Sequence, residues 1–328
     1  MGRRIQPVGI LYGHQAWFKL LFAQLERRRI PFVPIHAASH QYDAGETESP
    51  FSLVINRMSS SAHPRGHIQG IFHTTQYLYH LEKLGVPIIN GAAAQLIESP
   101  KAKQLALLSS LGLRFPRTKI VNHIDQVIPA ALSLRFPIVI KGNIGGSGTV
   151  IVRFDTLEGL RKAVSLYQIT LGIDATTLVQ EYLTAKDNHI VRVETLDQKF
   201  LYSIKVHTLG GSFNLCPAEL RMVPDLQEAQ AYLTGASHKG TRVDSYSPPA
   251  EIVRSAERIA REAQLDVGGI EYLINEEDGE PYFYGINALS SFVGDAVDIV
   301  GFDPYVEFVS YIEQRLELAH QVRETTIL

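Results

Sequence analysis

A glycine-rich turn between two strand-like runs limits the possible fold of this chain more than any other feature. In IVIKGNIGGSGTVIVRF, residues 138–154, apolar runs rich in Ile and Val flank a turn with four glycines, and Lys141 stands at its entrance. A turn with so few side chains lets a ligand approach the backbone, whose N–H groups can close over phosphate oxygens. The lysine could neutralise phosphate charge. A mobile turn beside a solvated lysine is the alternative interpretation.

The turn differs from two common nucleotide-binding motifs. No Lys-Ser or Lys-Thr follows its last glycine, so it is not a Walker A loop. A strand-like run follows it, whereas G-x-G-x-x-G opens a helix. The N-terminal stretch PVGILYGHQAW supplies only two well-spaced glycines, which argues against a dinucleotide-dependent oxidoreductase. Absence of NAD binding would exclude that class.

Length and composition exclude several classes of protein. A chain of 328 residues favours two or three compact units, and a net charge of -3 argues against a dedicated nucleic-acid binder. No run approaches the roughly 18 apolar residues that a membrane span needs, and the N-terminal apolar run is too short for a signal peptide. The single cysteine, Cys216, allows no intramolecular disulfide and is best explained by packing, and no histidine pair has zinc-site spacing. We expect a cytoplasmic protein without nucleic-acid or membrane partners.

Residues 1–98 alternate strand-like and helix-like patterns, which predicts a βαβ domain with a parallel sheet. Loops that bind ligands are expected at the carboxyl ends of its strands. The stretch SSSAHPRGH, residues 59–67, follows one such strand end. It fits a polar loop with a helix cap, and a contact of Arg57 or Arg65 with an anionic substrate is the alternative.

From residue 99 the pattern changes. A helix is predicted from near Pro100 to Gly112, then a helix, the glycine hairpin, a helix with Thr156 as N-cap and the strand TTLVQEYL. Strand-like runs fill residues 189 to about 216, followed by a long helix and two strands joined by a DG turn. The predicted fold class is therefore α/β and α+β, with domains at residues 1–98, 99–184 and 185–328.

Six pieces of the chain, in order, carry a resemblance to a known family. The chain resembles the ATP-grasp superfamily, and more particularly its carboxylate–amine ligases of the glutamate-adding, ribosomal-protein S6 modification-like type. The resemblance covers roughly residues 99 to 300. Its pieces are SPKAKQLALLSSLGLRFP, VIKGNIGGSG, LVQEYL, HIVRVE, SFNLC and LDVGGIEYLINEEDGEPYFYGIN.

This resemblance implies that two subdomains hold ATP between them. It implies phosphate contacts for Lys101 and Lys141 and a lid over the phosphates. It also implies that Arg192 and Lys205 approach the γ-phosphate and the acyl phosphate, although a surface arginine paired with Glu194 is the alternative for Arg192. Asn214 and Ser290 are candidate positioning residues. The implied lid residues are Gly145, Gly146, Ser147 and Gly148, and the implied adenosine contacts are Gln180, Glu181, Tyr182, Leu183 and, for the ribose, Asp187.

The resemblance also implies magnesium ions between the triphosphate and oxygen ligands on the last two strands. Glu271 and Asn287 match two of the expected Mg²⁺ ligands. The third does not match, because Gly285 stands where the family has an acidic residue, two positions before the asparagine. Asp295 is a possible substitute that no spacing compels. Loss of a bridging carboxylate should weaken metal binding and slow phosphoryl transfer.

The implied activity is ATP-dependent formation of an amide or peptide bond from a carboxylate and an amine, through an acyl phosphate. The substrates would be small molecules or peptides, and a homo-oligomer is compatible with the sequence. Gly285 keeps a second hypothesis open, an ATP-binding protein with weakened catalysis and a regulatory or partner-binding role. ADP formation with candidate carboxylates and amines would distinguish the two.

Overall fold

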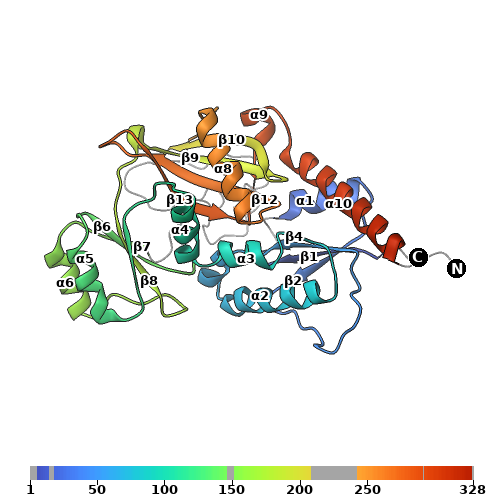
Figure 1. The fold of residues 1–328 in the computed structure, drawn as a ribbon, viewed down its shortest axis with the longest axis horizontal. Coiled ribbons are helices and arrows are strands. Elements are labelled where there is room, and N and C mark those ends of the chain that lie inside the picture. The colour runs from blue at the N-terminus through green and yellow to red at the C-terminus, as the bar shows by residue number, and fades with distance from the viewer. Residues whose placement is uncertain (1–5, 15–17, 146–150, 208–241, 291, 327–328) are drawn as a thin grey trace, which may run out of the picture.

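The computed structural model describes residues 6–14, 18–145, 151–207, 242–290 and 292–326. In this part of the chain, one parallel sheet and two antiparallel sheets are covered by helices (Figure 1). The predicted fold class, α/β and α+β with an N-terminal parallel sheet, is thereby confirmed. Among the helices of these residues, none is both long and apolar enough to cross a lipid bilayer.

The N-terminal sheet has central strands that are buried on both faces. Its strands are β1 (Val8–Tyr12), β2 (Phe32–His36), β3 (Leu53–Arg57) and β4 (Ile88–Ile89), in the order β2-β1-β3-β4. The helices around it are α1 (Lys19–Arg27), the 3₁₀ helix η2 (Ser60–Arg65), α2 (Ile68–Lys83), α3 (Ala92–Glu98) and the C-terminal helix α10 (Pro304–Thr326). Ile10 packs in one core with α1 and α10, and its neighbour Leu11 packs in another with α2. Alternation between two apolar faces is typical of a parallel sheet.

The middle sheet carries the glycine hairpin. Its strands are β5 (Thr118–Val121), β6 (Ile138–Gly142), β7 (Ile151–Phe154) and β8 (Thr177–Glu181), in the order β5-β8-β6-β7. One face is covered by α5 (Val127–Leu132), which follows η3 (Ile124–Gln126), and by α6 (Leu157–Ser165). The predicted N-cap is present, because Thr156 Oγ1 accepts a hydrogen bond of 3.1 Å from the amide of Gly159.

The C-terminal sheet is antiparallel throughout. Its strands are β9 (His189–Leu196), β10 (Lys199–His207), β11 (Val243–Ser245), β12 (Val267–Ile274) and β13 (Pro281–Asn287), in the order β11-β10-β9-β12-β13. Helix α8 (Ala250–Glu262) covers the face that carries Val191 and Val193. The short elements η4 (Lys186–Asn188) and α9 (Ala296–Val300) precede the sheet and α10 respectively.

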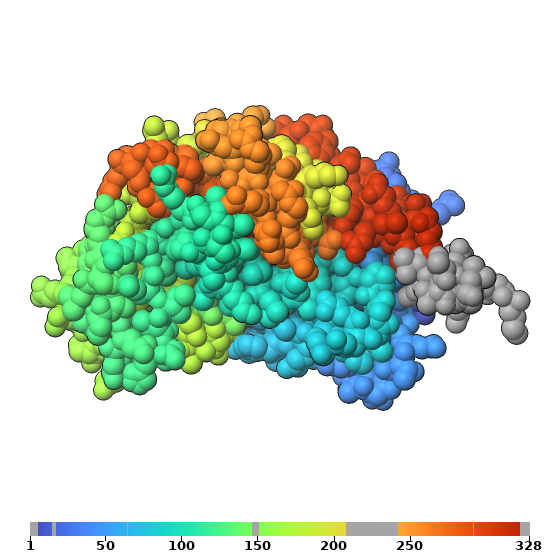
Figure 2. All heavy atoms as spheres, in the orientation of Figure 1, coloured from blue at the N-terminus to red at the C-terminus, as the bar shows by residue number. Residues whose placement is uncertain are grey.

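Helix α4 (Lys101–Ser110) packs on the C-terminal sheet although it precedes the middle sheet in the chain. Its Leu105 and Leu108 share a core with Ile259 of α8 and Ile286 of β13. Figure 2 shows the teal-green atoms of this region directly against the orange atoms of α8. The domain boundaries at residues 98 and 184 stay a prediction. Helix α4 falls in the predicted middle domain by sequence but packs against the C-terminal sheet.

Candidate active site

The candidate site lies where the middle sheet and the C-terminal sheet turn charged side chains toward each other. Ile138 and Ile140 point into the core beneath α5 and α6, so Lys141 on the same strand points to the opposite face. Val191 and Val193 point toward α8, so Arg192 points away from it. The charge of Glu271, which pairs with Arg192 in the register of β9 and β12, acts on the Lys141 ammonium group.

Lys141 is buried in this site and carries no carboxylate contact of its own among the described residues. Lys141 is only 8% exposed to solvent. Burial lowers the pKa of its ammonium group to about 7, the nearby charge of Lys101 lowers it as well, and Glu271 opposes both effects. A phosphate placed beside the Lys141 nitrogen would favour the charged form again. The side chain is therefore suited to an anionic ligand.

Lys101 holds the first part of the glycine turn. It is the first residue of α4, where its amide donates to the carbonyl of Asn143 at 2.9 Å, and its Nζ donates to the carbonyl of Gly145. Gly145 has φ of +149°, in the region that favours glycine. The structure thus brings Lys101 and Gly145 together with Lys141. The other predicted lid residues, Gly146, Ser147 and Gly148, lie outside the described residues.

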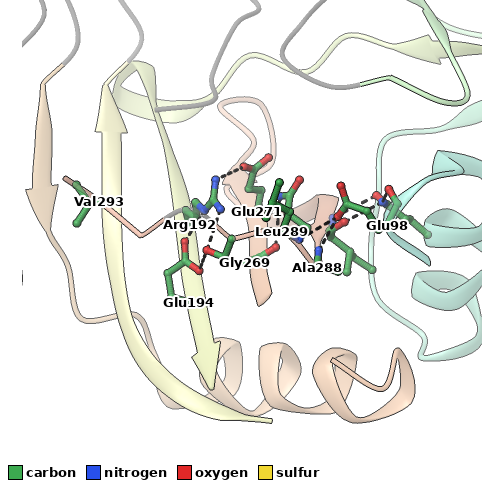
Figure 3. Close-up of polar contacts among 12 residues, drawn as sticks. Glu98, Arg192, Glu194, Gly269, Glu271, Ala288, Leu289 and Val293 are labelled. Carbon is green, nitrogen blue, oxygen red and sulfur yellow. Dashed lines mark hydrogen bonds and ion pairs between the residues drawn. The ribbon is translucent and has the colours of Figure 1, made fainter. Parts of the chain in front are cut away.

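Arg192 is the centre of a buried hydrogen-bonded network (Figure 3). Its Nε donates to Glu194 at 2.6 Å, one terminal nitrogen donates to Ser290 Oγ at 3.1 Å, and the other lies 3.5 Å from Glu271 Oε1. Ser290 Oγ in turn donates to Glu194. The alternative for Arg192 was a surface arginine paired with Glu194. The pairing is present, but Arg192 is buried, with 4% of its surface exposed. A Cβ atom at Gly269 would lie 2.8 Å from Arg192 Nε, so this glycine gives the guanidinium its space.

Glu271 and Asn287, the two predicted magnesium ligands, lie on adjacent strands on the same side. Asn287 pairs with Gly269 in the register, two residues from Glu271, and its amide hydrogen-bonds the Glu271 carboxyl group. Burial raises the pKa of Glu271, and Arg192 lowers it. No cluster of three or more His, Cys, Asp or Glu fit for a metal occurs in the described residues. Mg²⁺ commonly takes one or two carboxylates together with substrate phosphates. The donor set therefore fits a magnesium ion held jointly with a nucleotide.

Of two further charged residues near the site, Glu98 was missed from the sequence and Arg57 was considered only for a substrate contact. Glu98, at the end of α3, accepts hydrogen bonds from the amides of Ala288 at 2.6 Å and Leu289 at 3.4 Å (Figure 3). Arg57, which is 1% exposed, donates to the carbonyls of Ala288 and Ser290. Together they fix the segment that directly follows Asn287.

The side chain of Arg57 is oriented inward by two aromatic rings. Its guanidinium carbon lies 5.7 Å from the ring centre of Phe18 on the N-terminal side and 5.4 Å from that of Phe308 in α10. The hypothesis that Arg57 contacts an anionic substrate is therefore not supported, because the guanidinium is enclosed and bonded to backbone carbonyls. Nothing in the sequence marks the role of Arg57, which ends the otherwise apolar strand β3.

The predicted adenine segment uses most of its polar groups within the protein. Gln180 Nε2 donates to Thr118 Oγ1 at 2.7 Å, and the amides of Glu181 and Tyr182 donate to the carbonyls of Arg117 and Pro137, each at 2.9 Å. Among the described residues, no group accepts from the amide of Leu183. If an adenine binds here, the Leu183 amide is the expected donor.

Of three further predicted residues, Lys205 is turned away from this site, Asp187 is exposed, and Asn214 lies outside the described residues. Lys205 pairs with Val191 in the register of β9 and β10, so it shares the face covered by α8, and its Nζ lies 4.5 Å from the ring centre of Tyr246. It thus faces away from Arg192, which corrects its expected place beside the γ-phosphate. Asp187 is exposed on η4, in a left-handed conformation with φ of 53°. Asn214 lies outside the described residues, as does Cys216.

The family comparison agrees with this arrangement of sheets and cations. Residues 98–215 match the model described as the RimK-like ATP-grasp domain. The resemblance to the ATP-grasp superfamily is thereby confirmed.

Proteins similar in sequence are named as ligases. The chain is 22% identical over 302 residues to the alpha-aminoadipate–LysW ligase LysX of Sulfurisphaera tokodaii, a match that spans 87% of this chain and 94% of LysX. It is 27% identical over 171 residues to a probable alpha-L-glutamate ligase of Shewanella sp. strain MR-4, which spans 52% of this chain and 53% of that protein. The match thus covers about half of the glutamate ligase.

Solved structures confirm the ATP-grasp fold. The ATP-grasp ligase PsnB, complexed with a minimal precursor, superposes with a TM-score of 0.66 at 16% identity, covering 95% of this chain and 100% of PsnB. D-alanyl-alanine synthetase A from Vibrio cholerae superposes with a TM-score of 0.68 at 14% identity, covering 97% and 99% of the two chains. One further PsnB structure holds Mg and ADP.

Proposed function

We propose that this chain is an ATP- and Mg²⁺-dependent ligase that joins a carboxylate to an amine. The meeting of Lys141 from the middle sheet with Arg192 and Glu271 from the C-terminal sheet carries the proposal. Two cations and an oxygen ligand converge there in a buried space, which is suited to a triphosphate and to the charge that develops when it reacts. The ligase names of the relatives support it as well.

The proposed reaction has two steps. In the first, an oxygen of the substrate carboxylate attacks the γ-phosphorus of ATP, and the bond between that phosphorus and the bridging oxygen of ADP breaks. In the second, the amine nitrogen attacks the carbonyl carbon of the acyl phosphate, the carbon–oxygen bond to phosphate breaks, and the nitrogen loses a proton to the released phosphate.

The residues of this chain would act mainly by positioning and by neutralising charge. Lys141 and Lys101 would hold phosphate oxygens, and Arg192 would hold the two reacting anions close together. Glu194 and Ser290 keep the Arg192 guanidinium in one orientation, because each binds a different nitrogen. Closure of the glycine turn over the phosphates would exclude water that hydrolyses the acyl phosphate.

Glu271 and Asn287 would hold magnesium against the phosphate oxygens. When bound, the metal neutralises phosphate charge and orients the transferred group. Gly285 supplies no ligand, so the protein donors are one carboxylate and one amide oxygen on these strands. We propose that the nucleotide itself completes the coordination.

The substrates are proposed to be a small-molecule or peptide carboxylate and an amine. Among the similar proteins, LysX is named for alpha-aminoadipate and LysW, and PsnB is described with a precursor peptide. An ATP-binding protein with a regulatory role is the second candidate, which Gly285 favours. The ligase names of the relatives and the complete Arg192 network make it the weaker hypothesis.

ADP release from the full chain with Mg-ATP tests the proposal. Glutamate, aspartate and alpha-aminoadipate serve as carboxylate or amine donors, in pairs and with short peptides. We expect ADP release that needs both a carboxylate and an amine and that yields a stoichiometric amide detected by mass spectrometry. Nucleotide binding without amide formation across a broad panel would instead support the regulatory candidate.

A further inference from the structure

The carboxyl ends of β1, β2 and β3 lie where open parallel sheets have their ligand-binding crevice, and the proposed reaction does not use this region. The strand order β2-β1-β3-β4 means that the chain leaves β1 toward one side and later returns on the other, so β1 and β3 flank a topological switch point. Ligands of open parallel sheets bind outside the carboxyl ends of the strands at such a point. His14 follows β1 there, His36 ends β2, and residues 58–67 follow β3.

Side-chain contacts bring these three strand ends together. A Cβ atom at Gly13 would lie 2.8 Å from Met58 Sδ and 3.6 Å from Ala62 Cβ, so the end of β1 contacts η2. The rings of His36 and His67 lie 5.3 Å apart, centre to centre. Polar side chains from three separate loops therefore share one small region.

The side chains whose charges act on His14 are basic. The pKa of His14 is lowered to about 4, first by burial, then by the charge of Arg65, and further by His67 and His36. None of these neighbours is acidic. His67 is the N-cap of α2 and makes no side-chain cap, and the first turn of this 16-residue helix has no acidic residue. The positive pole of the α2 dipole adds to the same field.

Two buried polar atoms on the same 3₁₀ helix lack a partner among the described residues. They are Oγ of Ser60, a residue that is 3% exposed, and Nδ1 of His63. Buried polar groups of native proteins are nearly always hydrogen-bonded, so these two atoms, on the 3₁₀ helix that also carries Arg65, indicate a missing partner. An oxyanion supplies acceptors and charge at once.

The crevice is joined to the bond-forming centre through one carboxylate. The amide of Ser60 donates to Glu98, which also accepts from Ala288 and Leu289 after Asn287. Ser60 therefore lies one side chain away from the segment that follows Asn287.

We propose that His14, Ser60, His63, Arg65 and His67 form a subsite for the anionic end of the substrate, a carboxylate or a phosphate distant from the bond being made. The role as a substrate subsite rests on the proposed ligase function. Binding of an oxyanion in this crevice does not depend on the ligase function, so the ligase proposal and the oxyanion site can be disproved separately.

Histidine ring signals in NMR spectra of the full chain test the subsite. The protein is saturated with AMPPNP and Mg²⁺, so that the phosphate contacts between the sheets are occupied, and is titrated with inorganic phosphate, with glutarate and with neutral glutaramide. We expect shifts of the His14 and His67 rings with one or both oxyanions and none with glutaramide. Phosphate alone or glutarate alone would identify the oxyanion that the crevice selects.

Variants connect the shifts to this crevice. Arg65→Gln should weaken oxyanion binding at least tenfold, and Arg65→Lys should retain part of it. Arg27→Gln, an exposed arginine of α1, removes one charge from the same domain and should change nothing. If Arg65→Gln does not fold, Ser60→Ala with His67→Gln gives the same test.

The outcomes separate the inference from the function on which it rests. Absence of any ring shift with both oxyanions, or shifts that survive Arg65→Gln, overturns the subsite while leaving nucleotide binding intact. Failure to bind AMPPNP overturns the ligase proposal, and oxyanion shifts of the His14 and His67 rings would still establish the crevice as a binding site.

Discussion

Gly285 lies opposite Glu271 in the pairing of β12 with β13, and a Cβ atom at Gly285 would lie 2.8 Å from Oε2 of Glu271. The carboxylate of Glu271 thus uses space that an acidic residue at position 285 would need. Gly285 thus lacks the carboxylate of one expected metal ligand, and its missing side chain leaves space for the carboxylate of Glu271, the other acidic ligand.

Substitution of Gly285 separates crowding from charge. Gly285→Asp should tighten Mg²⁺ binding to the AMPPNP complex by about tenfold, or ~1.4 kcal/mol, because it adds a carboxylate ligand. It should also lower the free energy of unfolding by about 1–3 kcal/mol through crowding of Glu271. Gly285→Ala is the matched control. It should lose stability as Gly285→Asp does, but its affinity for Mg²⁺ should stay that of the unchanged protein. Calorimetry and chemical denaturation measure both, and equal Mg²⁺ affinity in the two variants would argue against a metal at this strand.

The lowered pKa of Lys141 predicts a pH-dependent affinity for nucleotide. Below about pH 7 the Lys141 ammonium group is already charged in the free protein, and above that pH it must take up a proton when the triphosphate binds. The affinity should therefore fall as pH rises from 7.5 to 9, by up to about tenfold per unit. Calorimetry in buffers of different ionisation enthalpy should detect the proton uptake. Lys141→Gln should bind AMPPNP more weakly and without this slope, and a slope that persists in the variant would assign the proton to another group.

Arg192 and Lys205 lie on opposite faces of the same sheet and should differ in their effect on turnover. Arg192→Met should lower kcat by roughly 10²–10³-fold, because it removes a preorganised cation from the reacting anions. Lys205→Met should leave kcat within about twofold, since its ammonium group lies over Tyr246 on the face of α8. Steady-state ADP release measures both. Comparable losses in the two variants would contradict the assignment of faces.

Arg57 should matter for stability as much as for activity. Arg57→Leu removes donors from the carbonyls of Ala288 and Ser290 and should lower the free energy of unfolding by about 2–4 kcal/mol. Arg27→Gln, at an exposed position, should change it by less than ~0.5 kcal/mol. Because the 288–290 segment follows Asn287, Arg57→Leu should also weaken Mg²⁺ binding. Urea denaturation that does not distinguish Arg57→Leu from Arg27→Gln would show that this guanidinium is not structural.

Local signals in the sequence predicted most elements correctly. Gly112, expected to end a helix, has φ of 66°, and Thr156 caps α6 as predicted. Helix α8 differs, because the left-handed position at its end is occupied by Gln264, with φ of 52°. The nearby Gly269 lies in β12, where its missing side chain makes room for Arg192. A glycine can serve side-chain packing as well as backbone conformation, and the local pattern does not distinguish the two.

The place of Lys205 depends on one irregularity that the sequence does not reveal. The two-residue turn at Asp197 and Gln198 pairs Leu196 with Lys199, and regular pairing from there would put Lys205 on the same face as Arg192. A bulge between Phe200 and Tyr202 shifts the register by one residue, and a shift of one residue turns every later side chain to the other face.

The contacts of Arg57 and Glu98 could not be predicted either. Their partners are backbone groups 231 and 190 residues away, which no periodicity or spacing connects to them. Lys141, Arg192, Glu271 and Asn287 were predicted as a group from the resemblance to the ATP-grasp superfamily, because strand periodicity alone does not connect residues of separate sheets.

Calorimetric titration of the full chain with AMPPNP in the presence of Mg²⁺ tests the central claim most directly. We predict binding of one nucleotide per chain that is weakened at least tenfold by Lys141→Gln and unchanged by Arg27→Gln. Absence of nucleotide binding, or binding that Lys141→Gln leaves unchanged, would contradict the assignment of the space between the two sheets to a triphosphate.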